Sequence, residues 1–149
     1  VSQHYGRRQL PQWVQDKYLT ETRNALKEHG IWSGELAYFR HGVEVPAGQR
    51  LVFCSGQLGI ARDGTIPPDC AGQTRLCFDN IAAILREAGM GLEHILRINA
   101  YVTDRAHLRP YMDVRDRLFS SPAPASTLMI VSGFARPEFK VEVEAIAAG

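Results

Sequence analysis

Apolar and polar residues alternate along residues 94–104, and this alternation is the clearest strand signal in the chain. A period of two places successive side chains on opposite faces of a strand. The set expected to face the core is apolar: Leu96, Ile98, Ala100 and Val102. The opposite set is polar or aromatic: Arg97, Asn99 and Tyr101. We therefore expect a strand with one face buried.

Four other runs have strand character: residues 36–45, 50–56, 127–131 and 140–147. Pro46-Ala47-Gly48, between the first two runs, is typical of a turn. Residues 61–70 contain Asp-Gly and Pro-Pro pairs, which predict a loop. The last run alternates, so that Glu142 and Glu144 share one face and the valines and alanines share the other.

Two segments have the apolar spacing of helices that pack on a sheet. In residues 72–88 apolar residues recur every three or four positions, and Gly89 is a typical helix end. In residues 107–119 the apolar line includes one charged residue, Arg115, and the prolines that follow are expected to end the helix.

The N-terminal region differs in composition from the rest of the chain. Residues 1–34 are polar and contain both tryptophans, and residues 12–29 have the pattern of an amphipathic helix. This helix either docks on the domain or a neighbouring subunit, or it covers a site as a lid. We treat residues 1–34 as an extension and residues 35–149 as one domain.

The predicted order is an extra helix followed by β, β, α, β, α, β and β. This order predicts a two-layer α+β domain with both core helices on one face of a mixed sheet. The other face would then be left open. Its residues are partly apolar, and a large exposed apolar face is unfavourable in water. A homo-oligomer that buries the sheet faces would remove this exposure.

Composition and charge limit which partners, ligands and cellular locations we expect for the protein. The 149 residues suffice for one domain, and a formal charge of +1 provides no strong field for nucleic acid or anionic lipid. No apolar run approaches the length of a membrane span, and no signal peptide is visible. The three cysteines lack a CxxC spacing, which fits a reducing cytoplasm. The five histidines lack metal-ligand spacing, so we expect no metal site.

Few residues stand out as candidates for catalysis or ligand binding. The chain has no GxSxG elbow, no P-loop and no GxGxxG after a strand. Glu142 and Glu144 either form a solvated edge or place a carboxylate in an intersubunit cleft, where it would orient water or shuttle a proton. Cys54 is either a nucleophile or a buried inert thiol, and Cys77 is expected in the core. Arg115 either extends to solvent or is a buried cation for an acidic ligand.

Four blocks in this order resemble the Rid superfamily, also called the YjgF family: FCSGQLGI, AGQTRLCFDNIAAILREAGMGLEHILRINAYVTD, PASTLMIV and VEVEAIA. The resemblance runs over residues 38–147. It implies a chorismate-mutase-like fold and a homotrimer with a central barrel and three clefts between subunits. It also implies cofactor-independent hydrolysis, in those clefts, of enamines and imines released by pyridoxal-phosphate enzymes, giving a keto acid and ammonia.

The resemblance also implies roles for single residues. Ser55 and Gly56 match a step whose backbone contacts ligand, and Glu142 matches a glutamate that positions the attacking water. Phe39 stands where the deaminases have a cleft tyrosine. Ser126 stands where they have an arginine that grips the substrate carboxylate, so simple 2-imino acids would lose that contact. The candidate substrate-binding residues are Phe39, Ser55, Gly56, Tyr101, Arg115, Ser126 and Thr127.

Three functions compete at this point. The first is a hydrolase of a labile enamine or imine that carries no α-carboxylate at the usual place, with Glu142 as the catalytic residue. The second is a non-catalytic trimeric module that binds a small ligand or acts as a chaperone. The third is the ribonuclease activity attached to older names of the family, which the balanced charge of the chain disfavours.

Overall fold

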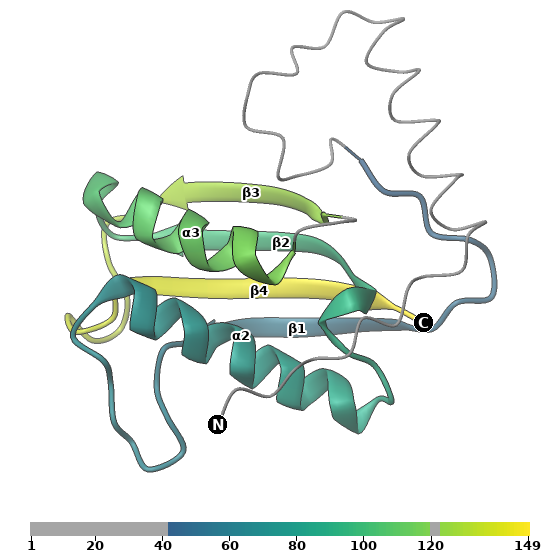
Figure 1. Cartoon of the computed structure of the whole chain (residues 1–149), viewed down its shortest axis with the longest axis horizontal. Coiled ribbons are helices and arrows are strands. Elements are labelled where there is room, and N and C mark those ends of the chain that lie inside the picture. Colours follow the sequence, from purple (N-terminus) through teal and green to yellow (C-terminus); the bar gives the residue numbers. More distant parts are fainter. Residues whose placement is uncertain (1–41, 120–122) are drawn as a thin grey trace, which may run out of the picture.

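The structure is a computed structural model that describes residues 42–119 and 123–149 (Figure 1). Two helices and four strands make up these residues, with a short 3₁₀ turn before β2 and another before α3. In chain order the elements are β1 (Leu51–Leu58), α2 (Cys70–Glu87), β2 (Ile95–Val102), α3 (Leu108–Leu118), β3 (Ala125–Ile130) and β4 (Val141–Ala148).

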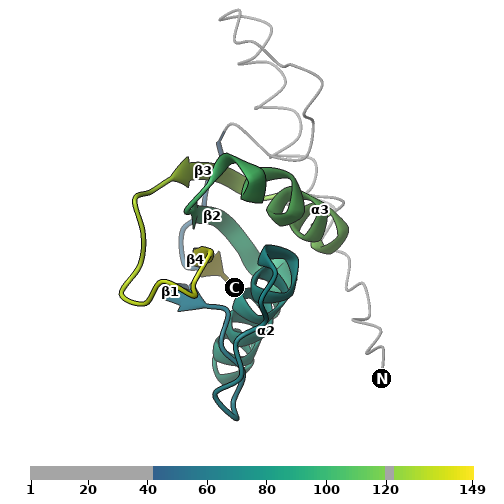
Figure 2. The ribbon, with the colours of Figure 1, turned by 90° about the vertical axis from the view of Figure 1, so that its left-hand side faces the viewer.

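The four strands form one mixed sheet in the order β1-β4-β2-β3. β2 and β3 are parallel and are joined by α3, while β4 runs antiparallel to both of its neighbours, β1 and β2. Figure 2 shows both helices on the same side of the sheet. The predicted α+β architecture, with two helices on one face of a mixed sheet, is thus confirmed.

The core lies between the helices and the apolar faces of β2 and β4. On β4 the valines and alanines of the alternating pattern are buried, and the two glutamates between them are only half-buried. The apolar stripe of α2 packs against this face and includes Cys77, which is fully buried as predicted. The period-two pattern therefore assigns the faces of β4 correctly.

Local capping sets the limits of α2. The carboxylate of Asp69 accepts a hydrogen bond of 2.7 Å from the backbone N–H of Gly72, which fixes the first turn. At the other end Gly89 has a φ of 72°, a left-handed conformation that favours glycine after a helix. The helix begins two residues before the predicted start at residue 72 and ends one residue before the predicted end.

Two strand predictions need correction. The register of β2 against β4 is irregular between Ile95 and Arg97, so Ile95 is buried in place of Leu96, which is only half-buried. Of the run 36–45, residues 42–45 form no strand, and the rest lie outside the described residues. β1 is hydrogen-bonded to β4 along its length, so its partner comes from the C-terminal end of the chain.

Several other predictions fall where the structure is not described, namely the amphipathic helix over residues 12–29, the residue Phe39 and the proline at 122. The helix predicted over residues 107–119 runs from Leu108 to Leu118 after a 3₁₀ turn, and so ends before the prolines. Neither α2 nor α3, the two α-helices of residues 42–119 and 123–149, combines the length and the apolar character of a membrane-spanning helix.

Candidate functional site

The face of the sheet away from the helices carries the candidate chemistry. The register pairs Tyr101 on β2 with Glu142 on β4, and Asn99 with Glu144. Asn99 is in turn paired with Thr127 on the edge strand β3. Polar residues from three adjacent strands therefore share one face, because side chains in register on neighbouring strands point to the same side.

Glu142 lies against an irregularity in β1. The register of β1 with β4 shifts between Cys54 and Gln57, and this bulge contains Ser55 and Gly56. A Cβ atom at Gly56 would lie 2.7 Å from the carboxyl carbon of Glu142 and closer still to one of its oxygens. The absence of a side chain at Gly56 is therefore what allows the Glu142 carboxylate to rest on the β1 backbone.

Glu142 and Glu144 differ in their hydrogen bonds although they share a face. Glu144 accepts one bond of 3.3 Å from Asn99 Nδ2 and another of 3.3 Å from the Tyr101 hydroxyl, so both its oxygens have a donor. Within the described residues no side chain or backbone group donates to the Glu142 carboxylate. Its lone pairs are available to a water molecule or a ligand.

Tyr101 interacts with both carboxylates, since it is opposite Glu142 on β4 and its hydroxyl donates to Glu144. Burial first, and then the negative charge of Glu144 and the hydrogen bond to it, raise the pKa of the Tyr101 hydroxyl, and Glu142 adds to the effect. Two nearby negative charges disfavour a tyrosinate. Tyr101 is therefore a neutral hydrogen-bond donor at physiological pH, held by Glu144.

A cation lies at the other end of the same face. Arg97 Nε donates to Asn99 Oδ1 at 3.0 Å, and Arg97 Nη2 donates to Thr127 Oγ1 at 2.7 Å. A chain of hydrogen bonds thus runs from Thr127 through Arg97 and Asn99 to Glu144. Both acceptors of Arg97 are neutral, and no carboxylate pairs with it in the part of the chain that the structure describes.

Two predicted binding residues point the other way, into the helix layer. Ser126 is paired with the buried Ile98, and its hydroxyl lies near the hydroxyl of the fully buried Tyr111. Burial raises the pKa of Tyr111 despite this neighbour, and neither hydroxyl completes a hydrogen bond within the described residues. The Ser126 hydroxyl is therefore unavailable to a ligand on the open face.

Arg115 is only 7% exposed and also belongs to the helix layer. Its guanidinium lies 5.8 Å from the centre of the Tyr111 ring and pairs with Asp116 at 2.6 Å. The cation is neither extended into solvent nor left free for an acidic ligand, because Asp116 neutralises it. The sheet separates Arg115 from Glu142, so one protomer does not bring these two candidates together.

Each of the three thiols has a pKa above that of an exposed cysteine. Burial raises the pKa of Cys54, and burial is also the main reason that the pKa of Cys77 rises to about 12. All three cysteines are buried and free, and a raised pKa keeps them as thiols at neutral pH. Of the two readings of Cys54, the structure favours the inert one.

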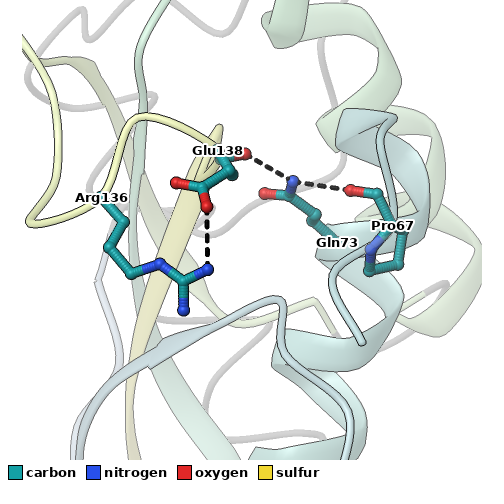
Figure 3. Close-up of polar contacts among 4 residues, drawn as sticks. All are labelled: Pro67, Gln73, Arg136 and Glu138. Atoms are coloured by element: carbon teal, nitrogen blue, oxygen red, sulfur yellow. Dashed lines mark hydrogen bonds and ion pairs between the residues drawn. The ribbon is translucent and has the colours of Figure 1, made fainter. Parts of the chain in front are cut away.

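Gln73, which no sequence motif marks, fixes the segment before Glu142. Gln73 on α2 is fully buried, and its Nε2 donates to the carbonyls of Pro67 at 2.8 Å and Glu138 at 2.9 Å (Figure 3). Its Oε1 accepts a hydrogen bond of 2.8 Å from the backbone N–H of Lys140. Gln73 therefore connects α2 to the start of β4. The detectable signal was a glutamine one turn before Cys77 on the apolar stripe.

The comparisons with known proteins agree on one family. The sequence model described as endoribonuclease L-PSP matches residues 35–149. The mitochondrial protein mmf2 of Schizosaccharomyces pombe is 33% identical over 100 residues, which cover 66% of this chain and 79% of mmf2.

Solved structures extend this result to the fold. The Rid-family protein YyfB of Yersinia pestis, of unknown function, superposes with a TM-score of 0.71 at 26% identity and covers 80% of this chain and 92% of its own. Escherichia coli TdcF, crystallised with bound serine, gives a TM-score of 0.63 at 28% identity over 70% of this chain and 84% of its own. The name of TdcF describes a candidate reactive intermediate deaminase.

Proposed function

This chain belongs to the endoribonuclease L-PSP family, the YjgF/Rid group, and from that membership we propose that it hydrolyses a reactive enamine or imine with Glu142 as its catalytic residue. The observation that carries the proposal is the difference between the two glutamates. Glu144 accepts hydrogen bonds from two donors, whereas Glu142 has no donor among residues 42–119 and 123–149 and rests on the β1 bulge beside Gly56. The name of TdcF supports a deaminase chemistry in this group.

The proposed reaction needs a base and a held water molecule. A water bound to Glu142 attacks the imine carbon, and the carboxylate accepts its proton. The protonated Glu142 returns this proton to the nitrogen, which gives a carbinolamine. The hydroxyl proton then passes to the nitrogen through the same carboxylate, ammonia leaves as the C–N bond breaks, and a carbonyl remains. An enamine must first take a proton on carbon to become the imine. Each step uses only water and proton transfers, so the proposal requires no cofactor.

The proposal includes a homotrimer. Near the two edges of the open face Phe53 is 69% exposed and Met129 is 54% exposed, which is costly for a protein that stays a monomer. Packing this face against further copies would bury both side chains and would place Glu142 at a seam between subunits. The division into residues 1–34 and 35–149 and a cytoplasmic location stay predictions, and mmf2 is named as mitochondrial.

A second candidate is a binding module without chemistry. The observation that favours it is Ser126, whose hydroxyl is turned into the helix layer and cannot hold a substrate carboxylate. A protein that keeps the fold but lacks this contact could bind a ligand without converting it. The two candidates differ in one measurable product, ammonia.

The experiment measures ammonia release from freshly generated 2-aminoacrylate and from a panel of imines without an α-carboxylate. Glu142→Gln keeps the shape of the side chain but removes the base, so we expect turnover to fall by about 10²-fold or more. Glu144→Gln is the matched control, two residues away on the same strand face, and should stay within a few-fold of the parent. Equal turnover by Glu142→Gln and the parent would exclude the mechanism, and a silent panel would favour the binding module.

A further inference from the structure

Arg97 is a charged side chain that the proposed mechanism does not use. Its guanidinium is held in a fixed orientation by two neutral acceptors, Asn99 Oδ1 and Thr127 Oγ1. A guanidinium has five N–H donors, and these two bonds occupy only two of them. The remaining donors form the planar array that binds a carboxylate through two parallel hydrogen bonds.

The orientation of Arg97 is informative because an acid lies within reach. Asn99 is directly opposite Glu144, so Arg97 is the diagonal neighbour of Glu144 on the adjacent strand. Diagonal neighbours are about 7–8 Å apart, a distance that an arginine can span. Arg97 instead turns toward Thr127 on β3, away from β4. Its charge is therefore directed to the edge of the sheet, where no described carboxylate meets it.

Arg97 and Glu142 of one copy are directed toward opposite edges of the sheet and not toward a common small ligand. Arg97 is opposite Ile146, which lies four residues along β4 from Glu142, and four residues of a strand extend about 13 Å. In an imino acid the carboxylate is bonded directly to the imine carbon, so the two groups that bind it must converge, whereas the Arg97 side chain turns across the sheet to β3 and away from β4. A site that uses both residues is incomplete without a second copy.

The sheet places these two groups toward opposite edges. Arg97 is bonded to the edge strand β3, and Glu142 rests on the other edge strand, β1. Identical chains that meet head to tail, with β3 of one beside β1 of the next, bring a free cation toward a free carboxylate at every seam. Such contacts form a closed ring when the rotation is right.

We propose that Arg97 is the anion-binding residue of a composite site, in which it binds the carboxylate of a small imino acid while Glu142 of the neighbouring copy holds the water. The inference rests on the proposed function and adds a substrate class to it. Ser126 has no positive charge with which to bind the carboxylate. The guanidinium of Arg97, which is hydrogen-bonded to the next residue along β3, Thr127, provides that charge instead. Carboxylated substrates are then accepted, with the carboxylate held in a different place.

The first test measures binding in the absence of turnover. Sodium pyruvate is the probe, acetone is the control without a carboxylate, and the readout is isothermal titration calorimetry on the whole protein. We expect Arg97→Met to weaken pyruvate binding by at least about tenfold and Arg97→Lys to weaken it less. Glu142→Gln should retain the binding. Unchanged affinity in Arg97→Met would overturn the proposal.

The second test asks whether the two groups come from different copies. Arg97→Met and Glu142→Gln chains are unfolded together and refolded at equal amounts. A seam is intact when its Arg97 comes from one variant and its Glu142 from the other, so random mixing restores about one quarter of the parental seams. Ammonia release near that fraction, from parents that are each nearly inactive, supports the proposal. A mixture as inactive as its parents overturns it.

Light scattering on each protein separates the remaining outcomes. If Arg97→Met and Arg97→Lys both lose the assembly of the parent, Arg97 forms a structural contact between copies, and the anion site is wrong. If both remain assembled and only Arg97→Met loses pyruvate, the site stands. Failure of the proposed function gives a different result, since Glu142→Gln would then release ammonia as fast as the parent.

Discussion

The two faces of the sheet are built from the same strands but are stabilised by different physics. On the covered face Ile98 and Val143 are fully buried under α2 and α3, and apolar burial determines what fits there. On the open face Asn99 and Glu144 are half-buried and are held by hydrogen bonds between strands. Adjacent residues on one strand thus differ in role, since one packs in the core and the next forms hydrogen bonds on the open face.

A second contrast lies within the open face. Glu144 is fixed by Asn99 and Tyr101, whereas Glu142 receives no hydrogen bond from any described residue and lies against the backbone at Gly56. Two carboxylates two residues apart therefore have different capacities for chemistry. The two glutamates share a strand face, so their position does not explain the difference. Glu144 is fixed because Asn99 and Tyr101 on β2 donate hydrogen bonds to it, and neither donates to Glu142.

The contrast between the faces is sharpest for Ile98 and Asn99, which are adjacent on β2. Ile98→Ala removes fully buried methyl groups, and we expect it to lower the free energy of unfolding by about 2–5 kcal/mol. Asn99→Ala removes half-buried hydrogen bonds and should cost about 1 kcal/mol. Urea unfolding of both variants measures the difference, and equal losses would break the contrast.

Gly56→Ala probes the free glutamate. The new Cβ would displace the Glu142 carboxylate from the β1 backbone, so we expect turnover to fall by about tenfold or more, which corresponds to about 1.4 kcal/mol in the barrier. The matched control is Gly42→Ala, because an added Cβ there meets nothing within 4 Å. Steady-state kinetics of the two variants test the prediction, and equal kcat values would contradict it.

Alkaline pH should act mainly through the covered face. Burial raises the pKa of Cys77 from 9.0 to about 12, and the pKa of Cys54 and of Tyr111 is also raised. The folded state therefore keeps protons that the unfolded chain releases. Stability from these groups is complete below pH 9 and is lost as the pH rises toward 12. Urea midpoints across this range should fall, and should fall less steeply in Cys77→Ala.

The smallest effect is expected at the buried hydroxyls. Tyr111→Phe removes a buried oxygen that completes no hydrogen bond, so we expect a change of less than about 1 kcal/mol, neutral or stabilising. Ser126→Ala is the companion variant, because its hydroxyl is the neighbour of Tyr111. Thermal unfolding measures both. A loss of several kcal/mol in Tyr111→Phe would show that the two hydroxyls form a strong bond.

Much of the fold was predictable because the spacing of apolar residues along the sequence shows which face of a strand or helix is buried. The alternation in β4 and the stripe of α2 assigned the core and the open face, and the family resemblance selected Glu142, Ser55 and Gly56, which the structure brings together. The bulge that buries Ile95 in place of Leu96 was not predictable, because a one-residue register shift depends on the partner strand.

The sequence by itself determined the α+β layers, the two glutamates on one face and the buried Cys77, since these follow from local periodicity and burial of apolar residues. Only the tertiary structure decided that Glu144 is held and Glu142 is free, that Asp116 neutralises Arg115, and that Arg97 turns to β3. These outcomes depend on which donors and acceptors the strands and helices bring together, and strand pairing joins residues far apart in the chain.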